Sequence, residues 1–368
     1  MNESEDYKRP VTPSAHSGTH QDGGSDEINV NDLSGELAAA QKSTISKVAG
    51  LTTFVQDLIL DNWTVRATPA GFAWFGVCWS PELELFVSVA ISGTTYRVIT
   101  SPDGINWTKR EHAAALSWRS VAWSPSLSLF AAVAASGTGN RVMTSPNGID
   151  WTSRTSPNDN DWFSVCWSPG RALFAAVAYG APSDRVMTSP NGIAWTTQAP
   201  TPSRDWRSIC WSEDLGLFVA VACSGTGDRV MTSPNGIDWT GGVSAGNLYW
   251  RCVIWVSELS LFVAVASAGH PNQVMTSADG IDWTSQTTPF SGAWFGVAWS
   301  SDLALLVAVS GGGTNDRIMT SPDGINWTAR PSGADNYWRS ICYSPKLKIF
   351  VAAAYQTGDN LIMTSLFY

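Results

Sequence analysis

The chain has 368 residues, of which 14% are charged and 20 are tryptophan, and its net charge is −9. This acidic balance argues against a nucleic-acid ligand, because phosphate backbones are bound by clustered Lys and Arg side chains. No run of about 18 apolar residues occurs, so we expect no membrane insertion.

Residues 1–60 contain no tryptophan and hold 9 acidic against 4 basic residues. The stretch TPSAHSGTHQDGGSDEINVNDLSGELAAAQ resembles a short element of bacteriophage tail fibres and other virion appendage proteins. The resemblance implies a virion protein, present in multiple copies on a phage tail or capsid appendage, that docks onto other virion proteins through residues 1–60. The candidate attachment residues are His16, His20, Gly23, Gly24 and Asp26, and the other matching positions are Thr19, Ile28, Leu33, Ser34 and Gly35.

Apolar residues between Ile45 and Leu58 fall near helical spacing and predict a short amphipathic helix, weakened by Gly50. This helix packs on a partner subunit or, alternatively, the segment is a tether. The four histidines of the chain form no repeated ligand set, so we expect no metal and no cofactor.

From Trp63 onward the sequence repeats every 44 residues. SPDGINWT occurs at residues 101–108 and again at 321–328, with four near-copies between them. Three tryptophan series follow this step and account for all 20 tryptophans. The series are Trp74, Trp118, Trp162, Trp206, Trp250, Trp294 and Trp338; Trp79, Trp123, Trp167, Trp211, Trp255 and Trp299, with Tyr343 in the last copy; and Trp63, Trp107, Trp151, Trp195, Trp239, Trp283 and Trp327.

One repeat divides into four short strand-like runs, over residues 74–80, 85–91, 97–101 and 105–110. The Asp-Gly or Asn-Gly pair before the fourth run predicts a type I′ hairpin turn. Four antiparallel strands repeated about every 40–45 residues are typical of a β-propeller blade. We therefore predict an all-β fold: a seven-bladed β-propeller of four-stranded blades, preceded by a mostly extended attachment segment.

The last copy stops before its fourth strand, whereas DNWTVR at residues 61–66 stands alone before the first copy. We predict that residues 61–66 complete the last blade, which removes the exposed edges of an open array. The domains are then residues 1–60, for attachment, and residues 61–368, the propeller.

SPDGINWT also resembles a shortened Asp-box (BNR-type) hairpin of sialidases and related propellers. Ser101, Asp103, Gly104 and Trp107 match, with one residue fewer between Asp and Gly. The resemblance implies the fold and is uninformative about activity, because the box is a structural turn.

A sialidase-like hydrolase would need an arginine triad, a tyrosine nucleophile and acidic partners, each used once and therefore outside the repeat. The propeller segment has five glutamates, and four of them lie in the regular turn after the first strand. We therefore predict no catalytic residues. The six cysteines largely occupy a repeated position that also takes Ala or Ile, so we predict free thiols.

The residue after the leading tryptophan is either arginine or phenylalanine. If the first strand lines the axis, four guanidinium groups could hold an anionic ligand; alternatively, each Arg stacks on a neighbouring aromatic ring as a cation–π pair. These four are Arg119, Arg207, Arg251 and Arg339. A second series, Arg97, Arg141, Arg185, Arg229 and Arg317, is interpreted as structural, each tied to a loop carboxylate.

The loops between the second and third strands, and the loops between blades, vary in every copy and emerge on the same side of the disc. Their aromatic and histidine side chains are candidates for binding a host surface glycan or protein. The function predicted is a phage tail or appendage adhesin; the alternatives are a glycan hydrolase and a purely structural decoration protein. The candidate residues are Tyr96, His112, Tyr179, Tyr249, His270, Phe290, Tyr337 and Tyr355.

Overall fold

The computed structural model describes residues 61–69, 71–180, 184–198, 202–267, 270–313 and 316–365. The chain divides between Val55 and Gln56, and all described residues belong to the second unit. The predicted boundary at residue 60 and the predicted helix over residues 45–58 therefore lie outside the described residues. The same holds for the attachment residues His16, His20, Gly23, Gly24 and Asp26.

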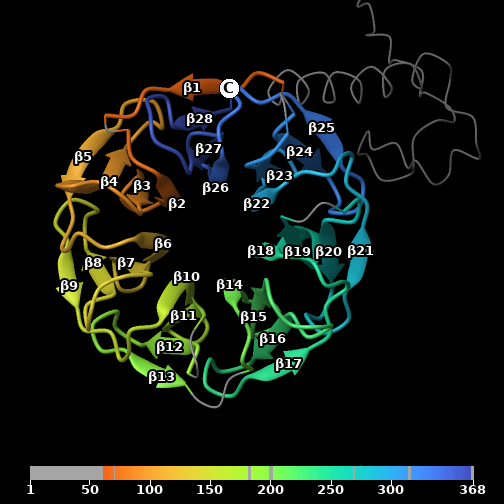
Figure 1. The fold of residues 1–368 in the computed structure, drawn as a ribbon, viewed down its shortest axis with the longest axis horizontal. Helices are drawn as coiled ribbons and strands as arrows, with labels where there is room; N and C mark the ends of the chain where they lie inside the picture. The colour runs from red at the N-terminus through yellow and green to blue at the C-terminus, as the bar shows by residue number, and fades with distance from the viewer. Residues whose placement is uncertain are drawn as a thin grey trace, which may run out of the picture. The chain divides into compact units, whose positions relative to one another are not determined.

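The described residues form seven four-stranded antiparallel sheets arranged around one axis (Figure 1). In six sheets the strands run outward in chain order, from the axis to the rim, and in the seventh β26, β27 and β28 do so while β1 forms the rim. The predicted seven-bladed β-propeller is confirmed. The strands are β1 (Thr64–Arg66), β2 (Trp74–Ser80), β3 (Leu85–Ala90), β4 (Tyr96–Ser101), β5 (Thr108–Glu111), β6 (Trp118–Ser124), β7 (Leu129–Ala134), β8 (Val142–Ser145), β9 (Thr152–Arg154), β10 (Asp161–Ser168), β11 (Leu173–Tyr179), β12 (Val186–Ser189), β13 (Thr196–Gln198), β14 (Trp206–Ser212), β15 (Leu217–Ala222), β16 (Val230–Ser233), β17 (Thr240–Gly242), β18 (Trp250–Val256), β19 (Leu261–Ala266), β20 (Val274–Ser277), β21 (Thr284–Gln286), β22 (Trp294–Ser300), β23 (Leu305–Ser310), β24 (Ile318–Ser321), β25 (Thr328–Arg330), β26 (Trp338–Ser344), β27 (Ile349–Ala354) and β28 (Ile362–Thr364).

The helical content of the described residues is one 3-10 turn, η1 (Ser257–Leu259). Among these residues there is no helix with the length and apolar character that a membrane crossing requires.

The last blade takes its outer strand from the front of the propeller segment. Strand β1 pairs antiparallel with β28, with Val65 opposite Met363, and the two strands lie side by side in Figure 1. Arg66 Nε donates to Thr364 Oγ1 at 2.9 Å, and Arg110 Nε donates to Thr100 Oγ1 at the same distance inside the first blade. The predicted closure by residues 61–66 is therefore confirmed.

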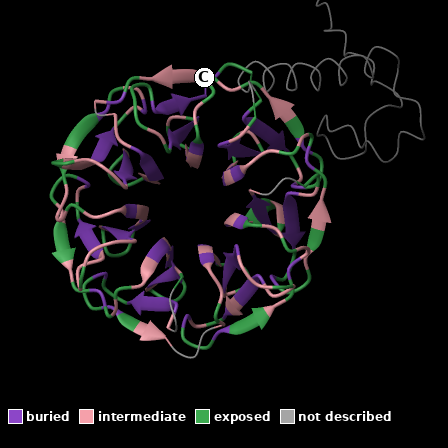
Figure 2. Ribbon diagram, viewed as in Figure 1, coloured by how far each residue is buried: buried purple, intermediate pink, exposed green. Residues whose placement is uncertain are grey.

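In six of the seven blades, two of the aromatic series sandwich a phenylalanine of the second strand, and in the sixth blade Leu306 takes its place. Phe86 has its ring 4.5 Å from that of Trp79 and 6.3 Å from that of Trp107. In the closing blade, Phe350 lies 4.8 Å from Tyr343 and 6.4 Å from Trp63 in the same arrangement. The leading tryptophans of all seven blades are fully buried, and Figure 2 shows the buried residues concentrated in the inner strands of each blade.

The SPDGINWT turn is wider than the predicted type I′ hairpin. In the first copy, Gly104 has a positive φ of 73° but Asp103 does not, whereas a type I′ turn needs both. Asp103 Oδ1 accepts the backbone N–H groups of Ile105 and Asn106 at 2.8 Å. Because these residues belong to the turn, β5 begins at Thr108 rather than at residue 105. The type I′ prediction and the start of that strand were wrong.

The position of Asp103 in this turn holds aspartate in three blades and asparagine in three others. Backbone N–H groups of Asp282 and Ile281 lower the pKa of Asp279 below its ordinary value of 3.8. Partial burial raises the pKa of Asp103 and Asp323, but hydrogen bonds led by those of Asn106 and Asn326 outweigh it, and both pKa values are lowered.

A carboxylate with a lowered folded-state pKa stabilises the protein above its unfolded pKa, and this contribution is lost as the pH falls through the folded value. We therefore expect the triple variant Asp103→Asn, Asp279→Asn, Asp323→Asn to lose less free energy of unfolding than the parent as the pH falls below about 4. Urea unfolding at several pH values measures this, and Asn191→Asp should show the opposite change. Parallel pH profiles for all three proteins would refute the assignment.

The six cysteines are unpaired in the structure. Burial raises the pKa of the thiols of Cys78 and Cys166. Both residues pack against hydrophobic clusters of the next blade, which agrees with a packing role.

Candidate functional site at the axial cavity

A β-bulge turns one residue of each innermost strand toward the axis. In every blade the register between the first and second strands shifts between the leading tryptophan and the residue two positions later, as between Trp74 and Gly76. The residue between them is the extra one, and such bulges re-aim a side chain. The same shift occurs in the other six blades.

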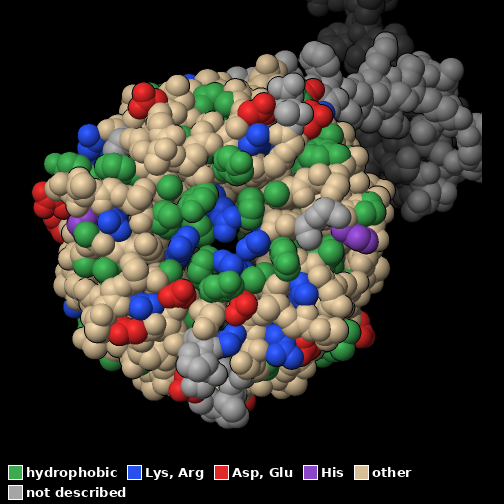
Figure 3. Space-filling model, in the orientation of Figure 1, with side chains coloured by type: hydrophobic (Ala, Val, Ile, Leu, Met, Phe, Trp, Pro, Cys, Tyr) green, Lys and Arg blue, Asp and Glu red, His purple; other side chains and the backbone are tan. Residues whose placement is uncertain are grey.

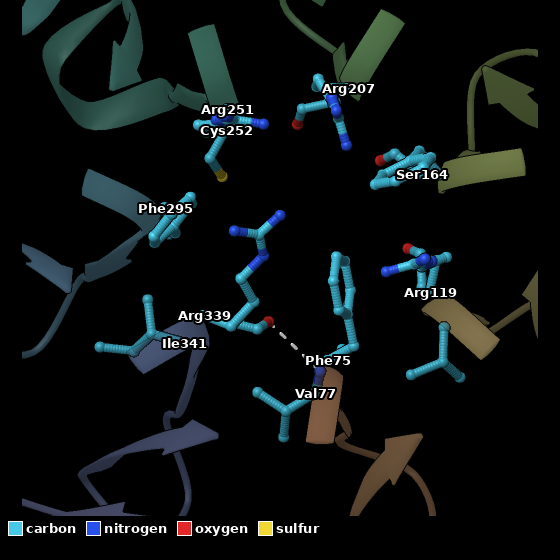
Figure 4. Close-up of a pocket in the computed structure, with 17 residues that line it drawn as sticks. Phe75, Val77, Arg119, Ser164, Arg207, Arg251, Cys252, Phe295, Arg339 and Ile341 are labelled. Atoms are coloured by element: carbon cyan, nitrogen blue, oxygen red, sulfur yellow. Dashed lines mark hydrogen bonds between the residues drawn. The ribbon is translucent and has the colours of Figure 1, made fainter. Parts of the chain in front are cut away.

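These seven bulge residues line an axial cavity of about 150 Å³ (Figure 4). We call them the axial ring: Phe75, Arg119, Phe163, Arg207, Arg251, Phe295 and Arg339. Arginine and phenylalanine alternate around the ring except where Arg207 and Arg251 are neighbours. In Figure 3, basic side chains gather at the centre of the disc with hydrophobic side chains around them.

The predicted cation–π pairs are present in this ring. The guanidinium carbon of Arg119 lies 4.6 Å from the ring centroid of Phe75 and 4.8 Å from that of Phe163. Arg339 lies between Phe295, at 3.9 Å, and Phe75, at 4.6 Å. The aromatic faces therefore hold the guanidinium groups in place.

The arginines of the axial ring have no carboxylate partner within the described residues. The residues lining the cavity include neither Asp nor Glu. Arg119 Nε is buried without a hydrogen bond, Arg207 Nε donates to Cys223 Sγ at 3.2 Å, and Arg251 Nε donates to Ser267 Oγ. Burial, and then the positive charges of Arg251, Arg207 and Arg119, lower the pKa of Arg339 to about 9.

Hydrogen bonds between blades tie together the wall of this cavity. Val165 N donates to Ser120 Oγ at 3.2 Å, and Val77 N donates to Ser340 Oγ at 3.3 Å across the junction of the first and last blades (Figure 4). At Gly76, a Cβ atom would come within 2.9 Å of the Arg119 carbonyl oxygen. The blades are thus in close contact here, and these contacts hold the backbone of the ring residues in place.

Three of the predicted binding residues lie next to arginines of the axial ring, and a fourth, Tyr337, lies next to Arg317 of the second arginine series. The ring centroid of Tyr179 is 4.0 Å from Arg207 Cζ, and that of Tyr355 is 5.8 Å from Arg339 Cζ. Tyr249 is 5.7 Å from Arg251, and Tyr337 is 5.7 Å from Arg317. Tyr249, Tyr337 and Tyr355 expose 50%, 55% and 40% of their surface.

The axial ring lies on the side of the variable loops, because Arg207 and Arg339 contact Tyr179 and Tyr355, where the second strands lead into those loops. We call this side the mouth face, and Figure 3 shows the centre of the disc hollowed. Tyr179 and Tyr355 stand at the same repeat position, at the end of the second strand of their blades. In two other blades this position holds Cys223, which accepts from Arg207, and Ser267, which accepts from Arg251. The repeat alignment contained this position, but its contact with the axial ring depends on the bulge and was not predicted.

The other predicted binding residues make local contacts, and neither they nor the four tyrosines are among the residues that line the cavity. The Tyr96 ring lies 5.6 Å from Lys109 Nζ, and His112 Nε2 lies 3.4 Å from the Thr94 carbonyl oxygen. His270 Nδ1 accepts a hydrogen bond from the Asn272 backbone N–H, and Phe290 packs on Trp294 at 5.0 Å. Within the described ranges, no three His, Cys, Asp or Glu side chains are grouped as metal ligands.

The second arginine series anchors the loops between blades, although not always through carboxylates. Arg141, Arg185 and Arg317 form ion pairs with Asp161, Asp205 and Asp335, respectively. Arg97 and Arg229 instead donate to the carbonyl oxygens of Leu116 and Leu248. The prediction of a carboxylate was wrong for these two, because Ser117 and Tyr249 replace the aspartate that lies 20 residues after the arginine in the second and third blades.

No protein family model and no curated protein matches the sequence. Among solved structures, the chain is similar to the β-propeller domain of Cps50 (Swd1) from Myceliophteria thermophila, with a TM-score of 0.60 and 13% identity over 82% of this chain and 99% of that chain. The GH74 enzyme of Niastella koreensis gives a TM-score of 0.64 and 14% identity over 82% of this chain and 53% of that one. Kuenenia stuttgartiensis hydrazine synthase gives a TM-score of 0.60 and 14% identity over 78% of this chain and 94% of that one. At these identities the likeness shows the fold alone.

Proposed function

We propose that this protein is a non-enzymatic binding protein of a phage virion, a tail or appendage adhesin that contacts a host surface glycan or protein through the mouth face. The observation that carries the proposal is the convergence on that face of the variable loops, the exposed tyrosines and the open axial cavity. Divergent loops on a repeated scaffold commonly form the specific contact surface of repeat proteins.

The chemistry of the mouth face favours binding over hydrolysis. Glycoside hydrolysis uses two carboxyl groups that flank the scissile bond, whereas the cavity is lined by arginine, aromatic and small side chains. Aspartates where the blade-to-blade loops end, such as Asp161 and Asp205, are paired with Arg141 and Arg185. Their hydrogen bonds hold loops, which supports a scaffold role.

The virion assignment depends on the resemblance of residues 12–41 to phage appendage proteins and, for the scaffold, on that of SPDGINWT to the Asp-box turn. In this proposal residues 1–60 dock onto other virion proteins, and several copies on one particle raise the avidity for a cell surface.

Binding of the fluorescently labelled full chain to a panel of whole bacterial cells tests the proposal. We expect Tyr249→Ala and Tyr337→Ala to weaken binding roughly tenfold or more, because exposed aromatic anchors contribute most of the energy of such contacts. Ile237→Ala and Ile281→Ala are the controls: both residues are similarly exposed, but they lie in turns of the opposite face, so binding should not change.

Two results would contradict the adhesin. Release of reducing ends from purified envelope polysaccharide would identify a hydrolase instead. Failure to bind any cell in the panel would leave a structural decoration role on the particle.

A further inference from the structure

The axial ring concentrates positive charge that the described protein groups do not neutralise. Elsewhere on the mouth face, arginines such as Arg141 and Arg185 lie against carboxylates. The four axial arginines have no carboxylate partner among the described residues. The side chain of Arg339 donates no hydrogen bond to another described residue. Buried or half-buried charges in proteins are normally paired, so four unpaired ones around one cavity indicate a missing counter-charge.

The geometry of the guanidinium groups indicates which chemical group supplies the missing negative charge. Their guanidinium carbons lie over the rings of Phe75, Phe163 and Phe295. Apart from Nε of Arg207 and Arg251, their N–H groups make no hydrogen bond with the described residues and are available to donate to a ligand. A guanidinium edge matches the oxygens of a carboxylate, sulfate or phosphate group, with two parallel hydrogen bonds. In Figure 4 the four arginines surround the cavity from different blades, so several edges face a common space.

We propose that the axial cavity binds one oxyanion group, a carboxylate, sulfate or phosphate, and that in the assembled virion this group belongs to an acidic carbohydrate. The cavity, of about 150 Å³, is large enough for such a group but not for a polymer backbone. The rings of Tyr179 and Tyr355 stand at its rim beside Arg207 and Arg339, where a sugar ring attached to the anion can stack on them. The carbohydrate part of this inference rests on the proposed binding function; the oxyanion site does not.

The lowered pKa of Arg339 agrees with this interpretation. Burial is its main cause, and repulsion from Arg251, Arg207 and Arg119 adds to it. An anion in the cavity opposes both effects, since it attracts all four charges. We therefore expect the empty ring to be electrostatically strained and the occupied ring to be more stable.

Calorimetric titration of the full chain with sodium glucuronate, sodium sulfate and sodium phosphate, at an ionic strength held constant with sodium chloride, tests the site. We expect saturable binding of one anion per chain, and no heat of binding for neutral glucose. Arg339→Phe should weaken this binding roughly tenfold or more, because it removes charge-assisted hydrogen bonds. Phenylalanine already occupies this ring position in three blades, so the variant is expected to fold.

Arg110→Gln is the matched control, because it removes the same charge from an outer strand. Glutamine stands at the equivalent positions 198 and 286 and makes the same hydrogen bond to threonine, so anion binding should stay unchanged. Glucuronate binding supports a carbohydrate-borne carboxylate, and binding of sulfate or phosphate alone supports a site filled by a free inorganic anion. No binding of any oxyanion, or equal binding by Arg339→Phe and the parent, would overturn the site. The titration uses no cells, so its result is independent of the adhesin assay. Anion binding without cell binding would support the site but not the adhesin, and cell binding without anion binding would support the adhesin but not the site.

Discussion

Phe218→Ala should lower the free energy of unfolding by about 3–5 kcal/mol, the cost of truncating a large side chain in a packed core. Phe218 is fully buried, and its ring lies 4.5 Å from that of Trp211 and 6.2 Å from that of Trp239. Alanine would leave a cavity between two indole rings that are fixed by their own strands. Denaturant unfolding followed by tryptophan fluorescence measures the loss.

Phe218→Leu is the matched control for this prediction. Leu306 occupies the equivalent position in the sixth blade and is fully buried there, so the repeat already accommodates leucine. We expect Phe218→Leu to cost only about 1 kcal/mol, since most of the side-chain volume is retained. Equal midpoints for Phe218→Ala and the parent would show that the sandwich contributes little to stability.

The features of the fold that depend on the repeat could be predicted from the sequence. A step of 44 residues determines the number of blades, and the tryptophan series mark equivalent places in each of them. Closure was predictable as well, because Trp63 stands one step before Trp107 and the last copy lacks its fourth strand. These inferences need only the comparison of one copy with another.

Details that depend on local hydrogen bonding were not predictable in the same way. The Asp-Gly pair favours a two-residue hairpin turn, but the carboxylate of Asp103 binds two N–H groups beyond Gly104 and widens the turn. Side-chain hydrogen bonds of this kind compete with the backbone pattern of a hairpin. The start of β5 at Thr108 follows from them.

The candidate site was predicted in part. The alternation of arginine and phenylalanine after the leading tryptophan was visible in the sequence, and so was the possibility that these residues surround the axis. The bulge between Trp74 and Gly76, which turns the intervening side chain toward the axis, has no marker in one strand considered alone. The contact of Tyr179 with Arg207 joins two blades, so it requires the three-dimensional arrangement of neighbouring copies.

Closure of the ring is the central claim, because it places Arg339 of the last blade beside Phe75 of the first and so completes the axial ring. Its most direct test compares Trp63→Ala with Trp107→Ala by denaturant unfolding. Trp63 and Trp107 expose 7% and 8% of their surface, and both rings are inclined at 40° to the phenylalanine on which they pack. The account predicts that each variant loses about 3–5 kcal/mol of unfolding free energy. An unchanged midpoint for Trp63→Ala, alongside a lowered one for Trp107→Ala, would contradict it.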